Sequence, residues 1–195
     1  KGSAEYEFAA QTQTTLAFVA LTLPLAIFSL PAGVLADRVS KRSLIVAMKA
    51  LELVLMVLAT AVLALAPAGH WSVLAILVLM GMQSALFSPG KYGILPELIP
   101  HEKLSAANGL LELWSFVGIV LGTVAGGLLL TLGDRFGGTW VAVSGLAFLA
   151  ALGFVASLWV PRVPAAAAMA APRSAFETLR GAQRVMWRDR PLRLA

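Results

Sequence analysis

The sequence predicts an all-α membrane protein. Of its 195 residues, 59% are hydrophobic and only 13% are charged, against about 25% charged in soluble domains. The apolar residues form five continuous runs, and a helix of about 20 such residues crosses a bilayer. A membrane β-barrel would instead alternate apolar and polar residues in segments of about ten. We therefore expect about five transmembrane helices.

Each expected span begins and ends near polar residues, tryptophan or proline. The five spans are residues 14–36, 44–66, 72–89, 106–132 and 139–160. The residues before the first span are polar or acidic, so they do not form the basic start of a signal peptide. A tight turn at 67–70 joins the second span to the third. Trp140 and Trp159 bound the fifth span about 28 Å apart along a helix, which suits the two interfacial belts. Trp114, in the middle of the fourth span, is expected to pack against other side chains.

Residues 161–195 differ in composition from the transmembrane bundle expected at residues 1–160. Four alanines at 165–168 belong to a flexible linker of low complexity. The segment 174–188 is amphipathic and rich in arginine. We expect it to form a helix that lies on the cytoplasmic membrane surface. The alternative is a helix that packs against the rest of the chain.

The basic residues predict how the bundle is oriented. Twelve of the 15 lysines and arginines lie between spans one and two, between spans three and four, or after span five. Lys1 and Arg135 lie on the other side, and Lys49 lies inside the second span. Because basic loops stay in the cytoplasm, we expect the N-terminus of this sequence outside and its C-terminus in the cytoplasm.

The turn between the first two spans, residues 33–42, carries the most informative short motif, GVLADRVSKR. Gly33 allows two helices to approach closely, and Asp37 can cap the next helix or pair with a neighbouring cation. The basic residues, which fix the topology, are Arg38, Lys41 and Arg42. The segment resembles the G-x-L-A-D-R-x-G-R-K signature of the major facilitator superfamily, with Ser40 where that signature has glycine.

The fourth span contains small residues four positions apart. Gly118, Gly122 and Gly126 make a flat stripe against which another helix can pack. The segment resembles the G-x-x-x-G-P-x-x-G-G motif in the fifth helix of exporters of the same superfamily, with Thr123 in place of the proline. Generic helix packing accounts better for the glycines themselves.

The two motifs together imply a register within the superfamily. The first span then corresponds to the second helix of the family and the fifth span to its sixth helix. The sequence would be a partial N-terminal half, lacking the first helix and the second half. The odd number of spans also predicts that the sequence is part of a longer protein.

A narrower resemblance lies around the start of the fourth span. Residues 88–98 read SPGKYGILPEL and residues 103–112 read KLSAANGLLE. They resemble the bacterial lysophospholipid transporter family, which carries S-P-x-K-Y-G-I-L-x-E-L and then K-L-x-x-A-N-G-L-x-E. The resemblance implies a transporter of the bacterial inner membrane that moves lysophospholipid from the outer to the inner leaflet by alternating access, for reacylation.

The same resemblance implies the partners. They are the lysophospholipid substrate, membrane lipid and the remaining half of the transporter. Some members of the family are fused to acyltransferase and acyl-carrier-protein synthetase domains, so such an enzyme is a further expected partner. Two alternative functions stay open: a small-molecule or drug exporter of the same superfamily, and a non-transporting membrane scaffold that recruits an acyltransferase.

Charges inside a span are costly unless they are paired or face a cavity, so they are candidate functional residues. Lys49 and Glu52 are spaced for an intrahelical ion pair, with Lys49 reaching toward the membrane surface. Glu112 has Asn108 one turn away, and the two make a polar face. Glu112 could pair with a substrate amine, carry a coupled proton or bond another helix.

Lys91 is the preferred substrate-binding residue. It lies at the end of the third span, between Pro89 and Tyr92, where the backbone is expected to bend. A lysine there could hold a lipid phosphate as a point charge, and the alternative is a topological anchor. The expected substrate-binding set is Lys91, Glu112 and Asn108.

Several classes of function are excluded on composition and motifs. There are no cysteines, which excludes disulfides and thiolate metal sites. The G-x-x-x-x-G-K-[ST] phosphate loop is absent, and neither histidine is followed by the aspartate that an acyltransferase of the fused type needs. We therefore expect no enzymatic activity, no cofactor, no metal and no nucleic-acid partner.

Overall fold

The computed structural model describes residues 2–65 and 70–162, which form six α-helices and one short 3-10 turn. The elements are α1 (Gly2–Arg38), α2 (Lys41–Leu65), α3 (His70–Gly93), α4 (Leu95–Leu98), the 3-10 turn η1 (His101–Lys103), α5 (Leu104–Phe136) and α6 (Thr139–Leu158). Two residues, Val39 and Ser40, make the turn between α1 and α2. The expected segments 165–168 and 174–188, and all of the turn 67–70 except His70, lie outside the described residues.

Five of these helical segments are long and apolar enough to cross a membrane. They are Glu7–Arg38, Lys41–Leu65, Trp71–Leu98, His101–Phe136 and Thr139–Leu158. The protein is therefore a multi-pass membrane protein, and the expectation of an all-α bundle with five spans is confirmed for the described residues. Only 6% to 17% of the most apolar stretch of each span is buried. The large remaining apolar surface is suited to lipid or to further transmembrane helices.

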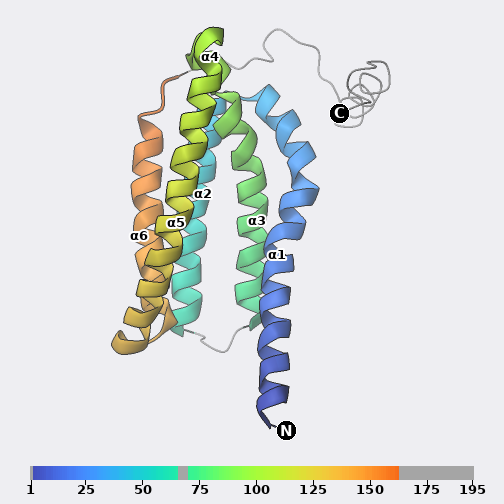
Figure 1. The fold of residues 1–195 in the computed structure, drawn as a ribbon, viewed down its shortest axis with the longest axis vertical. Helices are drawn as coiled ribbons and strands as arrows, with labels where there is room; N and C mark the ends of the chain where they lie inside the picture. Colours follow the sequence, from blue (N-terminus) through green and yellow to red (C-terminus); the bar gives the residue numbers. More distant parts are fainter. Residues whose placement is uncertain (1, 66–69, 163–195) are drawn as a thin grey trace.

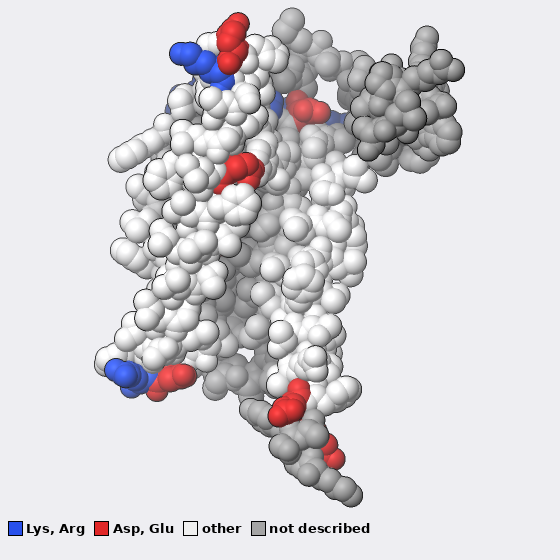
Figure 2. All heavy atoms as spheres, viewed as in Figure 1, with Lys and Arg blue, Asp and Glu red and all other residues white. Residues whose placement is uncertain are grey.

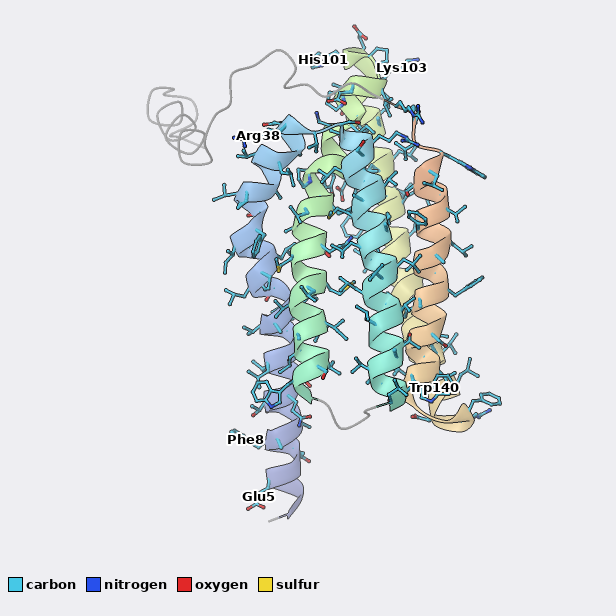
Figure 3. The ribbon with its side chains drawn as sticks, turned by 180° about the vertical axis from the view of Figure 1, so that it is seen from behind. Glu5, Phe8, Arg38, His101, Lys103 and Trp140 are labelled. Atoms are coloured by element: carbon cyan, nitrogen blue, oxygen red, sulfur yellow. The ribbon has the colours of Figure 1, made fainter. Side chains whose placement is uncertain are left out.

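The long helices pack in the pairs α1–α3, α3–α2, α2–α6 and α6–α5, and Figure 1 shows α5 in front of α2 and next to α6. The helices α1, α3 and α6 run toward the end of the bundle where α4 lies, and α2 and α5 run away from it (Figure 1). We call this the α4 end. Figure 3 shows Arg38, His101 and Lys103 at the α4 end, and Glu5, Phe8 and Trp140 at the opposite end.

Charged side chains gather at the two ends of the bundle and leave most of the flank uncharged (Figure 2). The basic residues at the α4 end of the described chain are Arg38, Lys41, Arg42, Lys91, Lys103 and Arg162. Arg135, in the last turn of α5, lies at the opposite end. The helices thus bring together cations that are far apart in the sequence.

Glycines permit the closest helix contacts. A Cβ atom on Gly81 of α3 would overlap the backbone carbonyl oxygen of Leu21 in α1, so only glycine fits this α1–α3 crossing. In the α5–α6 pair, a Cβ on Gly145 would lie 2.7 Å from a methyl group of Leu129. These contacts fix α1 against α3 and α5 against α6.

Two helix ends differ clearly from those expected. The helix α1 already begins at Gly2, and α3 continues past Pro89 to Gly93. A proline removes a single backbone hydrogen bond, and the remaining bonds carry the helix on, so the expected end at Pro89 is wrong. At Thr123, where the exporter motif has proline, α5 is continuous and the hydroxyl bonds the Ile119 carbonyl at 2.8 Å.

The expectation for Trp114 is also wrong within the described residues. Its side chain is 65% exposed, so it makes little of the packing expected for it. The reason is that, among the long helices, α5 packs mainly against α6. The face that carries Trp114 is left open.

Candidate functional site

Two side-chain hydrogen bonds join the end of α3 to α5. Lys91 Nζ donates to Ser115 Oγ at 2.6 Å, and the Tyr92 hydroxyl donates to Glu112 Oε1 at 2.6 Å. We call these four residues the α3–α5 junction. The junction lies near the α4 end, because α3 ends one residue after Tyr92.

The helical period explains why these side chains meet. Glu112 and Ser115 are three residues apart and therefore share one face of α5. Lys91 and Tyr92 are adjacent in the last turn of α3, so their side chains diverge by about 100°. Each of them reaches a different residue of α5. The structure thus brings the predicted residues Lys91 and Glu112 together, with Asn108 exposed one turn nearer the start of α5.

The two hydroxyl groups of the junction have opposite roles. Ser115 Oγ donates its own hydrogen to the Leu111 carbonyl at 2.6 Å, so it meets Lys91 as an acceptor. The Tyr92 hydroxyl gives its single hydrogen to Glu112 and therefore serves a carboxylate. The Lys91 ammonium is thus bonded to a hydroxyl that accepts a hydrogen, and the Glu112 carboxylate to a hydroxyl that donates one.

The two charges of the junction do not pair with each other. The ion pairs found in the described part of the chain are Lys41–Glu97 and Lys49–Glu52. Lys91 and Glu112 are each half-buried, and Lys91 Nζ also lies 5.2 Å from the centre of the Tyr92 ring. Within the described residues, the ammonium and the carboxylate are thus each bonded to a neutral hydroxyl and not to each other.

The predicted intrahelical pair between Lys49 and Glu52 is present, with Nζ and Oε2 2.7 Å apart. The Lys49 side chain is 24% exposed. Its ammonium lies 5.0 Å from the centre of the Phe87 ring of α3, and a Cβ on Gly153 of α6 would be 3.6 Å from it. The attraction of the aromatic face for a cation holds Lys49 between three helices.

Basic residues of the turn motif bind groups far along the chain. Lys41 forms an ion pair with Glu97 of α4, whose second carboxylate oxygen, Oε2, is buried without a hydrogen-bond partner. Arg42 Nε donates to the Val160 carbonyl at 2.7 Å, and Arg42 Nη2 donates to the Leu158 carbonyl at 3.1 Å. These contacts tie the start of α2 to α4 and to the end of α6.

The remaining motif residues lie at the surface of the described bundle. Asp37 and Arg38 are exposed. A Cβ on any of the motif glycines would meet nothing within 4 Å; these are Gly33, Gly118, Gly122 and Gly126. The helix contacts expected at these glycines are therefore not made by the described residues.

Two polar residues that form hydrogen bonds between helices were not predicted from the sequence. Ser115 completes the junction, and its only signal is the three-residue spacing from Glu112. Gln83 is 3% exposed, and its amide nitrogen donates to the Met48 carbonyl at 3.1 Å, linking α3 to α2. A search of the described residues finds no group of three or more histidine, aspartate or glutamate side chains that could hold a metal ion.

Comparison with protein families decides the class of protein to which the bundle belongs. The family model described as Major Facilitator Superfamily matches residues 4–195. The chain belongs to the major facilitator superfamily. Transport is the usual activity of this superfamily, and its members are typically not enzymes.

Curated relatives within the superfamily include lysophospholipid transporters named LplT. The LplT of Serratia proteamaculans strain 568 is 40% identical over 116 residues, which cover 57% of this chain and 27% of the relative. The LplT of Yersinia pestis strain Pestoides F is 35% identical over 122 residues, which cover 60% of this chain and 28% of the relative. The matched region therefore spans about a quarter of the length of these relatives. No solved structure matches the chain.

Proposed function

We propose that this chain is part of a transporter that moves lysophospholipid from the outer to the inner leaflet of a bacterial inner membrane. The similarity to two transporters named for lysophospholipid supports the substrate class. The observation that carries the proposal is the α3–α5 junction, where Lys91 and Glu112 lie side by side without pairing.

The charges of the junction suit a phospholipid headgroup. Lys91 has one hydroxyl partner and further N–H donors, so it can hold a phosphate as a point charge. Glu112 has a second oxygen for an amine, and exposed Asn108 offers further hydrogen bonds one turn away. The apolar flank of α5, with Leu113 and Trp114 exposed, gives the single acyl chain an apolar path.

The depth of the junction fits a headgroup. Lys91 lies 20 residues after Trp71, which is about 30 Å along α3, close to the thickness of the hydrocarbon core. The junction is therefore near the membrane interface. The basic residues at the α4 end support a cytoplasmic position for that end, because basic loops stay in the cytoplasm.

The transport cycle would follow alternating access, in which two halves of a transporter rock around a central site. The headgroup would leave the outer leaflet, bind between the halves and be released to the inner leaflet for reacylation. An acyltransferase would then consume the product, and either a gradient or this trapping would drive transport.

Leaflet-resolved uptake of headgroup-labelled lysophosphatidylethanolamine tests the proposal in cells that carry the full-length protein. We expect Lys91→Ala and Glu112→Ala each to lower uptake about tenfold or more at normal expression, since each removes a charged hydrogen-bonding group. The matched controls are Lys103→Ala and Glu102→Ala, which remove exposed charges of η1 at the same end.

Two results would count against the proposal. Uptake by the wild-type protein no higher than in cells without it would contradict lysophospholipid transport. Normal uptake by both site variants would contradict the site while leaving the transport function standing.

A drug exporter of the same superfamily is the second candidate. The glycine stripe of α5 and its resemblance to the exporter motif favour it. Extrusion of fluorescent cationic dyes from the same cells distinguishes the two. An exporter would remove the dye and leave lysophospholipid uptake unchanged, whereas a lysophospholipid transporter would give the reverse result.

A further inference from the structure

The two charges of the α3–α5 junction are close enough to pair, yet each binds a neutral hydroxyl. Glu112 and Ser115 are separated by about 4.5 Å along α5, and Lys91 bonds Ser115. Rotation about the flexible Lys91 and Glu112 side chains would therefore bring the ammonium to the carboxylate. Opposite charges inside a membrane span usually pair with each other.

We infer that Ser115 and Tyr92 are positioning residues that keep Lys91 and Glu112 apart, so that both charges stay available to a zwitterionic headgroup. Ser115 has given its hydrogen to Leu111, so its oxygen can serve only a donor, namely Lys91. Tyr92 gives its hydrogen to Glu112. The headgroup role rests on the proposed function, whereas the separation of the charges does not.

The chemistry of a zwitterion requires this separation. A phosphate and an ammonium joined by a short linker can bind a cation and an anion that stand side by side. If the two protein charges paired with each other, the ligand would first have to break that ion pair, which would weaken binding. The hydroxyls thus lower the cost of binding without having to touch the ligand.

Carbodiimide crosslinking of the purified full-length protein tests the separation directly. A membrane-permeant carbodiimide activates the Glu112 carboxylate, the Lys91 amine attacks it, and an amide forms as the reagent leaves as its urea, having taken up the elements of water. Peptide mass spectrometry then reports the Lys91–Glu112 amide. We expect little of it in the wild type and at least a fivefold higher yield in Tyr92→Phe and in Ser115→Ala.

Transport kinetics test the consequence with a double-variant cycle. We expect Tyr92→Phe to raise the KM for lysophosphatidylethanolamine about tenfold, with kcat nearly unchanged, since the ligand must displace a new ion pair. In a Glu112→Gln background no such pair can form, so Tyr92→Phe should change the KM less than twofold. A role of Tyr92 in packing alone would give the same change in both backgrounds.

The possible results separate this inference from the proposed function. An equally high crosslink yield in the wild type, or no increase in either variant, would overturn the separation whether or not the protein transports lipid. Additive effects on KM would overturn its role in binding. Crosslinking that rises as expected in a protein without lysophospholipid uptake would keep the separation and reject the substrate.

Discussion

Arg42 Nε of α2 donates a 2.7 Å hydrogen bond to the carbonyl oxygen of Val160, just beyond the end of α6. A second bond, from Nη2 to the Leu158 carbonyl, lies beside it. The last carbonyl groups of a helix have no partner within the helix, and a cation near them is favourable. Arg42, a residue of the turn motif, therefore caps the C-terminal end of α6.

Replacing Arg42 should loosen this contact. We expect Arg42→Ala to lower the free energy of unfolding by about 1–2 kcal/mol, because two carbonyl groups lose a charged donor. Arg42→Lys should recover part of the loss, since lysine keeps the charge but not the forked geometry. Thermal unfolding of the purified protein in detergent measures both, with Lys103→Ala as the control, and equal midpoints for all variants would contradict the cap.

The ion pair between Lys41 and Glu97 predicts a different pattern. Their side chains are only 9% and 17% exposed, so removing one partner leaves the other charge partly buried. We expect Lys41→Met to cost about 3 kcal/mol and the double variant Lys41→Met, Glu97→Leu to recover most of that loss. Detergent unfolding of both variants checks this. If the double variant were the less stable of the two, the pair would not explain the loss.

The sequence anticipated features that depend on one helix at a time. The five spans follow from apolar runs, because a helix needs about 20 such residues to cross a bilayer. The Lys49–Glu52 pair follows from the helical period, which fixes how far apart two residues of one helix stand. Even for this pair, the position of Phe87 and Gly153 around Lys49 could not be foreseen, since it depends on how α2, α3 and α6 pack.

Contacts between distant residues could not be predicted in the same way. Lys41 and Glu97 are 56 positions apart, and Arg42 and Val160 are 118 positions apart. No spacing rule connects such residues, so the sequence indicated only that the cations fix the topology. The site was predicted through its charges, Lys91 and Glu112, whereas neutral Ser115 became visible only when α3 and α5 were placed together.

Variants of the Lys49–Glu52 pair can show whether these charges inside the span serve stability or transport. We expect Lys49→Met to destabilise the protein by about 3 kcal/mol, because the Glu52 carboxylate loses its partner, and Lys49→Met with Glu52→Leu to restore most of the stability. If the pair serves packing alone, the double variant keeps its transport activity. Detergent unfolding and lysophospholipid uptake, measured on the same variants, check both expectations. A stable double variant without uptake would instead assign the pair a part in transport.

The crossing of α1 and α3 at Gly81 gives the sharpest packing prediction. A Cβ there would overlap the Leu21 carbonyl oxygen and would lie 3.4 Å from the Pro24 Cβ, so both helices would have to shift. We expect Gly81→Ala to cost about 1–3 kcal/mol. Gly109→Ala is the matched control, because a Cβ on Gly109 meets nothing within 4 Å, and alanine favours the helix by up to about 1 kcal/mol. Unfolding in detergent should therefore place the Gly81 variant below the wild type and the Gly109 variant level with it or above, and the reverse order would reject the close approach of α1 and α3.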